Sequence, residues 1–234
     1  MMKGDFPVGE FVGWKTPFYF YDLPLLERTL DAVRSEIQDR PLWQVHYAVK
    51  ANANPEILKR IASAGFGADC VSGGEIRMAL EAGFPPESIV YAGVGKSDDE
   101  IAYALESGIA CFNVESSAEL LVIEEIAAKM GKVAPVSLRV NPDIGAHTHA
   151  NITTGLAENK FGIFHGMLDE VIRLALGCPH ISYGGLHFHI GSQILDMSDF
   201  VALCNRINDL TERLERMRLP VGEVNVGGGL EFFK

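Results

Sequence analysis

Lys50 is the side chain in this sequence with the clearest potential for covalent chemistry. It ends the stretch Val45–Lys50, in which apolar residues alternate with other residue types in the period-2 pattern of a β-strand. A lysine at the end of a strand is commonly a solvated charge at the edge of a sheet. This strand is short and mostly apolar, however, and a buried amine loses its proton more easily and becomes a nucleophile. We therefore expect Lys50 to be buried and to serve as an amine nucleophile.

Two histidines occupy alternate positions of a later strand, in the sequence HFHIGSQ. His187 and His189 share one face of that strand, and such a pair at a strand end can bind a metal through both imidazoles. Alternatively, one imidazole stacks on a flat aromatic ligand while the other packs in the protein wall. A metal site would also need an acidic residue beside the pair, and no strand end supplies an obvious one, so we favour stacking. A second pair, His147 and His149, lies in a polar loop that we expect to be solvated.

Three consecutive glycines, Gly227, Gly228 and Gly229, follow the last strand that the sequence indicates. Without side chains their N–H groups are unobstructed, and their backbone can approach a phosphate closely. A plain flexible turn is the alternative reading of this triplet. Ser192, shortly after His189, could add a hydroxyl to the same phosphate. We therefore expect these two segments to bind the phosphate of a ligand.

One unit recurs from residue 44 onward and would position these side chains. A short apolar strand leads through a polar turn into an amphipathic helix, and the next strand then follows. The first strands recur about every 20–25 residues, as in a parallel sheet of alternating strands and helices. The expected strands are 44–49, 67–71, 88–92, 110–114, 135–140, 183–190 and 223–227. The expected helices are 55–63, 73–82, 98–107, 116–130, 167–176 and 198–217.

Parallel strands with helices on one side close most naturally into an α/β fold of the (β/α)8 TIM-type barrel class, with active groups on the loops after the strands. A doubly wound open sheet is the alternative, but a glycine-rich dinucleotide loop would then normally follow the first strand. This sequence has KANAN at that place. The polar candidates all follow strands, which fits the barrel: Lys50, Asp69, Ser72, Glu75, Lys96, Asn113–Glu115, Arg139, Asn141, His187, His189, Ser192 and Gly227–Gly229.

The number of strands is one short of a closed barrel. We find seven barrel strands, whereas closure of this class of barrel needs eight. Either one strand escapes the pattern, or this polypeptide is shorter than the unit that folds and works. The β-rich segment 16–21 precedes a helix that leads into the barrel, so we expect it to belong to a separate sheet.

Composition limits the partners and the compartment of the protein. The formal net charge of −11 argues against nucleic acids and anionic membranes as partners, but backbone amides could still bind an anionic cofactor. No apolar run approaches the roughly 18 residues of a membrane span, and the first residues do not form a secretory signal. The four cysteines are scattered, as in proteins whose thiols stay reduced. We therefore expect a cytoplasmic protein.

Eight stretches of the sequence together resemble one family, the fold-type III decarboxylases that depend on pyridoxal 5'-phosphate. Their order and spacing are similar above all to the diaminopimelate-decarboxylating branch, whereas alanine racemases and ornithine decarboxylases share only some of them. The stretches are YAVKAN, ADCVSGGEI, YAGVGKSDDEI, FNVESSAEL, LRVNPD, NKFGI, GLHFHIGSQI and NVGGGL. The resemblance implies a lyase of lysine biosynthesis that converts meso-2,6-diaminopimelate, a small amino acid, to L-lysine as a homodimer.

The resemblance also implies a domain division and residue roles. Residues 1–22 would add a strand to a C-terminal β-domain, and residues 23–234 would form the barrel that binds pyridoxal phosphate. Lys50 would hold the cofactor covalently, His189 would stack on its ring, and Ser192 with the three glycines would bind its phosphate. Two further residues match positions that the family keeps near the cofactor: Arg139 and Glu75.

The likeness ends after the glycines, where the family continues to a tyrosine and this chain ends with Glu231–Lys234. Further on, the family has an acidic partner for the ring nitrogen, an arginine for the substrate carboxylate, and a cysteine and tyrosine at a dimer-shared site. We therefore expect this polypeptide alone to decarboxylate at a negligible rate. Two alternatives stay open: a non-catalytic barrel that binds pyridoxal phosphate, and a metal-dependent barrel hydrolase that uses His187 and His189.

Overall fold

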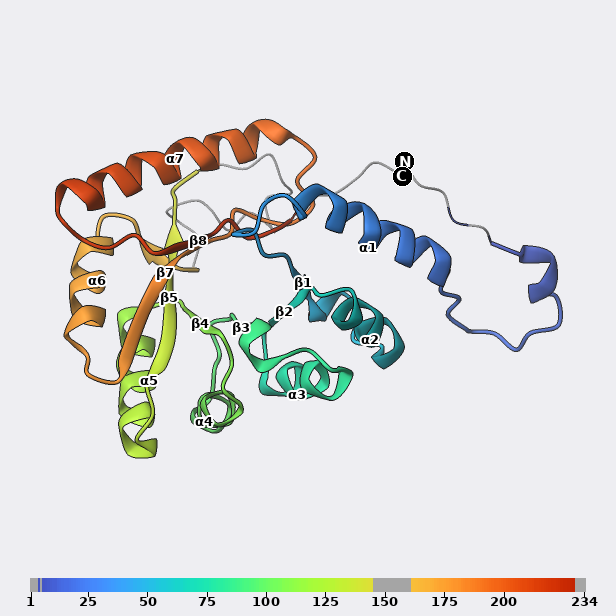
Figure 1. Ribbon diagram of the computed structural model, residues 1–234, viewed down its shortest axis with the longest axis horizontal. Helices are drawn as coiled ribbons and strands as arrows, with labels where there is room; N and C mark the ends of the chain where they lie inside the picture. Colours follow the sequence, from blue (N-terminus) through green and yellow to red (C-terminus); the bar gives the residue numbers. More distant parts are fainter. Residues whose placement is uncertain (1–3, 5, 145–160, 230–234) are drawn as a thin grey trace.

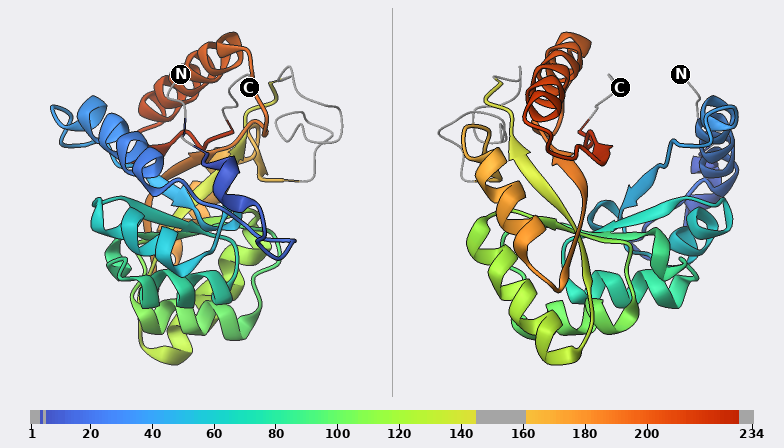
Figure 2. Two further views of the ribbon diagram at one scale, coloured as in Figure 1. Left: turned by 90° about the vertical axis from the view of Figure 1, so that its right-hand side faces the viewer. Right: turned by 60° about the vertical axis from the view of Figure 1, so that its left-hand side comes forward.

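The computed structural model describes residues 4, 6–144 and 161–229, which form a parallel sheet bent into an open arc (Figures 1 and 2). Seven strands follow one another in the order β1-β2-β3-β4-β5-β7-β8, and β6 pairs with β5 beside this path. All of the pairs are parallel. The strands are β1 (His46–Ala48), β2 (Gly67–Cys70), β3 (Ile89–Tyr91), β4 (Cys111–Val114), β5 (Ala134–Asn141), β6 (Ile163–Phe164), β7 (Ile181–Phe188) and β8 (Glu223–Asn225). The predicted barrel class is confirmed, in the form of a half-barrel.

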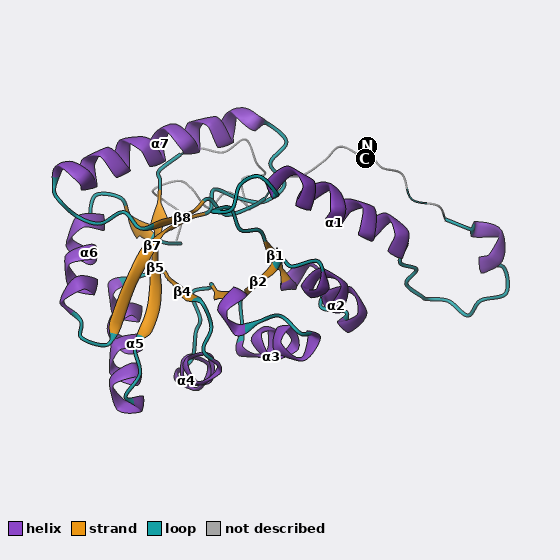
Figure 3. Cartoon of the chain, in the orientation of Figure 1, coloured by secondary structure: helices purple, strands orange, loops and turns teal. Residues whose placement is uncertain are grey.

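Helices connect the strands and cover the outer side of the arc (Figures 1 and 3). They are α1 (Leu23–Ile37), α2 (Pro55–Ser63), α3 (Gly73–Ala82), α4 (Asp98–Ser107), α5 (Ser117–Met130), α6 (Leu168–Gly177) and α7 (Met197–Arg216). Three short 3-10 turns add to these: η1 (Val8–Phe11), η2 (Val49–Ala51) and η3 (Pro86–Ser88). None of the helices in the described ranges combines the length and apolar character that crossing a bilayer requires.

The two faces of the sheet differ because side chains alternate along each strand. On β5, Val136 and Leu138 are fully buried and belong to the apolar core between the sheet and the outer helices. Ser137 and Arg139, at the intervening positions, point to the inner side of the arc. The apolar core therefore lies between the sheet and the outer helices, and the inner face of β5 carries polar residues.

The strands and helices predicted beyond residue 44 are all found, and no bound differs from its prediction by more than two residues. β6 is the one strand that the sequence pattern did not indicate among the described residues. Its two residues are too few to show a period-2 pattern. Helix α1 begins after Asp22, whose carboxylate accepts a hydrogen bond of 2.8 Å from Leu25 N.

The segment 16–21, predicted to be a strand, is not one in the structure. A strand needs a neighbour to accept and donate its backbone hydrogen bonds, and no described strand runs beside this segment. Its rings pack locally instead, Phe18 and Phe20 both against Phe11. The division into residues 1–22 and 23–234 as parts of different domains stays a prediction.

The arc is open between β8 and β1. Within the described residues, β1 pairs only with β2, and β8 pairs only with β7. The right-hand view of Figure 2 shows the two ends of the arc, with α1 beside one and α7 beside the other. β1, which leads directly into the turn that carries Lys50, is therefore an edge strand of the described sheet.

Candidate active site

Polar side chains are buried along the inner side of β4, β5 and β7, at alternate positions of the strands or just after them. They are Asn113, Glu115, Ser137, Arg139, Asn141 and His187. Parallel strands are usually apolar on both faces, because both faces are packed. The polar residues buried on this inner face therefore mark it as a candidate binding surface. Three of its buried atoms have no hydrogen-bond partner in the part of the chain that the structure describes: Asn113 Nδ2, Glu115 Oε2 and His187 Nδ1. Such atoms call for a ligand or water to satisfy them.

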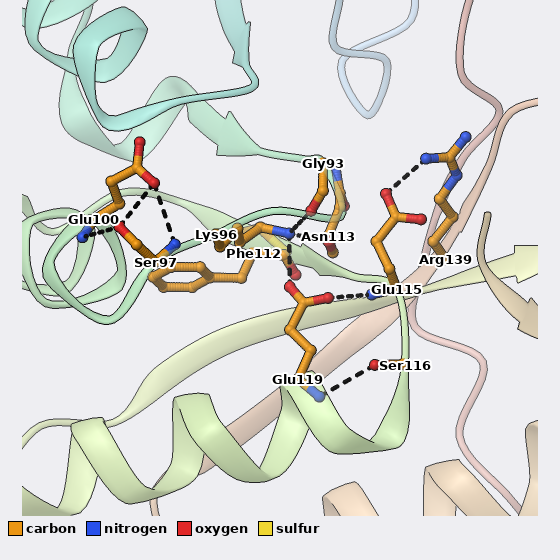
Figure 4. Close-up of polar contacts among 11 residues, drawn as sticks. Gly93, Lys96, Ser97, Glu100, Phe112, Asn113, Glu115, Ser116, Glu119 and Arg139 are labelled. Atoms are coloured by element: carbon orange, nitrogen blue, oxygen red, sulfur yellow. Dashed lines mark hydrogen bonds and ion pairs between the residues drawn. The ribbon is translucent and has the colours of Figure 1, made fainter. Parts of the chain in front are cut away.

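Arg139 and Glu115 form a buried ion pair at the centre of this face (Figure 4). Arg139 Nη1 donates to Glu115 Oε1 over 2.6 Å, and the two side chains are 10% and 4% exposed. Arg139 on β5 also lies opposite His187 on β7 in the parallel register. The ion pair thus fixes a positive charge beside the two histidines.

Both histidines are neutral at physiological pH. Burial, the largest cause, and the positive charges of Arg139 and Lys50 together lower the pKa of His189 to about 4. Burial, followed by the charge of Arg139, holds the pKa of His187 well below its ordinary value. A neutral imidazole can lie against an aromatic ring without bringing a charge into the site, which suits the stacking role predicted for His189.

Lys50 is exposed, so the prediction that it is buried was wrong. The residue lies in η2, just after β1, and among the described strands β1 pairs only with β2. The charge of Lys50 nevertheless acts on the inner face, where it lowers the pKa of both Asp69 and His189. Asp69 on β2 pairs with Ala48, two residues before Lys50.

Asp69, one of the polar candidates of the sequence, is an acidic group near Lys50. Burial raises its pKa to about 6, against the opposing effect of the Lys50 charge. Its Oδ1 atom is buried and has no hydrogen-bond partner among the described residues. The available signal was its alternation with Ala68 and Cys70, which places it on the inner face of β2.

The glycine triplet lies directly against the loop that follows β7. A Cβ atom added to Gly227 would lie 2.3 Å from the Phe188 carbonyl oxygen and 3.1 Å from His189 Nδ1. One added to Gly229 would lie 2.0 Å from the Gly191 carbonyl oxygen, and Ile194 N donates to Gly229 O over 2.8 Å. Only glycine allows the two backbones to approach so closely. The two predicted phosphate-binding segments are therefore neighbours.

Ser192 and Glu75 differ in what the structure shows of them. Ser192 is partly buried in the loop that the glycines contact, and its Cα would lie 3.4 Å from a Cβ at Gly229. Glu75 instead caps the start of α3, where its Oε2 accepts a hydrogen bond of 2.8 Å from Val71 N. The Glu75 charge raises the pKa of Asp69, so it acts on the inner face, but its contact with a cofactor stays a prediction.

The geometry brings most of the predicted site together on one side of the sheet: Lys50, Arg139, His189, Ser192, Gly227, Gly228 and Gly229.

The alternative of a metal site has less support. Within the described ranges, no three His, Cys, Asp or Glu side chains gather in a way that could hold a metal ion. His147 and His149 lie outside the described residues.

Comparisons with known proteins identify the family of this chain. A family model described as "Pyridoxal-dependent decarboxylase, pyridoxal binding domain" matches residues 24–233. The diaminopimelate decarboxylase of Bacteroides thetaiotaomicron is 60% identical over 229 residues, which are 98% of this chain and 59% of that protein. The Haemophilus influenzae protein of the same name is 43% identical over 227 residues, 97% of this chain and 54% of that one.

Solved structures show the same fold. Diaminopimelate decarboxylase from Helicobacter pylori, complexed with L-lysine, superposes with a TM-score of 0.88 at 40% identity over 95% of this chain and 56% of its own. The enzyme of that name from M. jannaschii gives 0.86 at 34% identity, over 97% and 54%. This chain thus spans little more than half the length of the relatives it matches.

Proposed function

This chain belongs to the pyridoxal-dependent decarboxylases, and we propose that it forms the cofactor-binding part of an enzyme that converts meso-2,6-diaminopimelate to L-lysine. The names of its relatives and the L-lysine in the H. pylori structure support this substrate. The relatives extend well beyond the matched region, so we propose the activity for a protein that has both parts.

The inner face fits pyridoxal phosphate by the chemistry of its side chains and by its close-packed glycines. Lys50 would hold the cofactor through its amine, and the N–H groups of Gly227–Gly229 with the Ser192 hydroxyl would bind its phosphate. His189 would lie against its ring. When bound, pyridoxal phosphate supplies an electron sink for breaking the bond to a carboxylate.

The protein side of the reaction is to orient groups and set their protonation. Burial, together with the charge of Arg139 that Glu115 holds in place, keeps His189 neutral, so that the imidazole would lie flat against a ring without repelling a cationic nitrogen. Asp69, whose pKa burial raises to about 6, is ionised at neutral pH and adds a negative charge near Lys50. The buried polar atoms of the inner face would bind polar groups of the ligands or ordered water.

The packing of the glycine triplet against the His189–Ser192 loop is the observation that carries the proposal. To test it, this chain is continued with the C-terminal part of the B. thetaiotaomicron relative and supplied with pyridoxal phosphate. We expect equal amounts of CO2 and L-lysine from meso-2,6-diaminopimelate, and neither product from the Lys50→Ala variant. Release of CO2 from the Lys50→Ala variant at the same rate would contradict the proposal.

A barrel that binds the cofactor without turnover is the second candidate, since the family model that matches this chain describes a pyridoxal binding domain. The same fusion protein separates the two functions. Cofactor bound to Lys50 without any CO2 release would favour the non-catalytic barrel.

We also propose that the complete enzyme is a cytoplasmic homodimer that acts on a small amino acid and binds neither nucleic acid nor membrane. The four cysteines are all free thiols, and the formal net charge is −11. Both features suit a reducing compartment and disfavour polyanionic partners. Sedimentation of the fusion protein is expected to give the mass of two chains, and a monomer with full activity would contradict the dimer.

A further inference from the structure

Lys96 is a buried cation that the proposed function does not use. Its side chain is 1% exposed. The ammonium group donates to three acceptors, Gly93 O at 2.7 Å, Asn113 O at 2.9 Å and Glu119 Oε1 at 2.6 Å (Figure 4). An ammonium has three protons to donate, so all of them are engaged. The three acceptors come from the loop after β3, the end of β4 and the first turn of α5.

Burying this ion pair is a poor way to stabilise a fold. Removing two charges from water costs several kcal/mol per ion in general, and apolar replacements of similar size are often neutral or stabilising. A buried ammonium instead fixes the positions of its acceptors, because three of them must lie around one nitrogen. Here the Lys96 ammonium holds the Asn113 carbonyl oxygen close to the Glu119 carboxylate.

Glu119 carries the connection one step further. Its Oε1 accepts from Lys96, and its Oε2 accepts a hydrogen bond of 2.8 Å from the backbone N–H of Glu115. The carboxylate therefore lies between the lysine and the residue that binds Arg139. Both ends of the segment Asn113–Glu115 are thus fixed, Asn113 directly by Lys96 and Glu115 through Glu119.

The last contact reaches the inner face. The Glu115 carboxylate accepts from Arg139 over 2.6 Å, and the charge of Arg139 acts on both His187 and His189. Figure 4 shows the sequence of contacts from Lys96 to Arg139. Each contact joins groups that are buried or nearly so, with Glu119 the most exposed at 14%.

We propose that Lys96 is a positioning residue: it fixes the end of β4 so that Glu115 holds the Arg139 guanidinium beside His189. This inference rests on the proposed function, in which His189 lies against the cofactor. The Lys96 ammonium has its three protons engaged with the loop, the strand end and the helix, and its charge also lowers the pKa of His187 directly. The competing explanation is that Lys96 stabilises the fold and has no effect on Arg139.

The test compares Lys96→Met, Lys96→Arg and the double variant Lys96→Met/Glu119→Gln with the wild-type chain. The double variant removes both buried charges, so no charge is left unpaired. Lys129→Met is the matched control, since Lys129 and Glu125 also lie 2.6 Å apart but are 69% and 66% exposed. Two quantities are measured: the pKa of the His189 ring by NMR without cofactor, and the dissociation constant of pyridoxal phosphate.

We expect the His189 pKa to rise in Lys96→Met and in the double variant, because Arg139 is no longer held beside the ring. Pyridoxal phosphate should bind roughly tenfold more weakly, within the range for networks that couple sites. Lys96→Arg, which keeps the charge, should recover part of both effects, and Lys129→Met should change neither. If Lys50 does not bind the cofactor, the wild type fails the binding measurement, but the His189 pKa still tests the positioning role.

Either of two outcomes in the double variant would overturn the inference. One is a folded double variant whose His189 pKa and affinity for pyridoxal phosphate equal those of the wild type. The other is loss of folding in the double variant, because Lys96 would then be needed by the fold rather than by Arg139. Glu115→Gln gives an independent check, since adding Lys96→Met to it should cause no further change in the His189 pKa. Additive changes would also contradict the positioning role.

Discussion

At the scale of single residues, Arg139 sets the electrostatics of the inner face. Its guanidinium is fixed by the Glu115 carboxylate over 2.6 Å and lies opposite His187 in the register. The charge contributes to the low pKa of both histidines and opposes the burial that raises the pKa of Asp69. One buried cation thus favours neutral imidazoles and an ionised carboxyl on the same surface.

Asp69 and His189 should give opposite pH dependences of stability. Burial raises the pKa of Asp69 to about 6 from 3.8, so its stabilising contribution is present below pH 3.8 and lost as the pH rises through 6. Burial lowers the pKa of His189 to about 4 from 6.5, so its contribution is present above pH 6.5 and lost as the pH falls through 4. Between pH 4 and 6, the wild type therefore loses stability through Asp69 and gains stability through His189 as the pH rises, and the two effects offset each other.

Single variants should reveal each slope in urea unfolding measured across this pH range. Relative to wild type, Asp69→Asn should gain on the order of 2 kcal/mol in free energy of unfolding between pH 4 and 7. His189→Gln should show the reverse trend, gaining relative to wild type as the pH falls from 6.5 to 4. Parallel curves for the two variants would show that these groups do not titrate as described.

The three glycines should differ in their tolerance of a side chain. Gly229→Ala places a Cβ 2.0 Å from the Gly191 carbonyl oxygen at a residue with φ of +108°, whereas a Cβ at Gly228 meets nothing within 4 Å. We expect Gly229→Ala to lower the free energy of unfolding by about 2 kcal/mol and to weaken pyridoxal phosphate binding. Gly228→Ala should leave stability within about 0.5 kcal/mol of wild type. Equal thermal stability of the two variants would contradict the close packing of the loops.

At the scale of elements, helices α3, α4 and α5 begin in the same way. A serine accepts a hydrogen bond from the backbone N–H of a glutamate three residues later: Ser72 from Glu75, Ser97 from Glu100, and Ser116 from Glu119. Two of these glutamates also reach a neighbouring unit, since Glu100 accepts from Gly73 N and Glu119 accepts from Lys96. The caps therefore join successive strand–helix units at the edge that carries the site.

Glu100 offers a test of these connections. Its carboxylate accepts from Gly73 N at 2.8 Å and from Ser97 N at 3.2 Å. Glu100→Ala removes a cap and a tie to α3 at once, so we expect a loss of about 1–2 kcal/mol in free energy of unfolding. Glu106→Ala, an exposed position on the same helix, should stay within about 0.5 kcal/mol. Chemical denaturation measures both, and equal losses would mean that the cap does not join the units.

The sequence could predict the elements because each one is specified locally, by strand alternation, a helix period and a cap. Helices α2, α3 and α4 have the predicted bounds for this reason. Properties that depend on contacts between distant residues could not be predicted from the sequence. The exposure of Lys50 follows from the absence of a described strand beyond β1, which no local pattern encodes. Glu75 has a family-like position, but its carboxylate is used by Val71 N, and sequence spacing cannot decide between a cap and a ligand contact.

The buried polar residues show the same limit. Lys96 follows a strand like the other candidates, but only the fold reveals that its ammonium has three protein acceptors. The segment 16–21 has strand composition, yet composition alone cannot supply a pairing partner. Sequence patterns therefore predicted where the helices and strands lie and which side chains share a face. They failed where tertiary structure decides whether a side chain is buried or which group it contacts.

At the scale of the whole molecule, the half-barrel gathers the site on its concave side and leaves one end open. Helices cover the outer side (Figure 1), and buried polar residues of β4, β5 and β7 lie on the inner side. Lys50, in η2 after β1, belongs to one end of the described sheet, and the glycine loop after β8 belongs to the other. The charge of Lys50 still reaches His189, so the two ends of the arc face a common space.

The most direct test of whether the inner face binds the cofactor through Lys50 is to fix pyridoxal phosphate on the chain with borohydride. The modified lysine is then located by peptide mass mapping. We predict that Lys50 carries the label at cofactor concentrations that leave Lys59 and Lys129 unmodified. Those two lysines are 55% and 69% exposed and serve as controls for simple accessibility. Labelling should also fall in Gly229→Ala. Label spread over the exposed lysines, with none preferred at Lys50, would contradict the assignment of the inner face as the cofactor site.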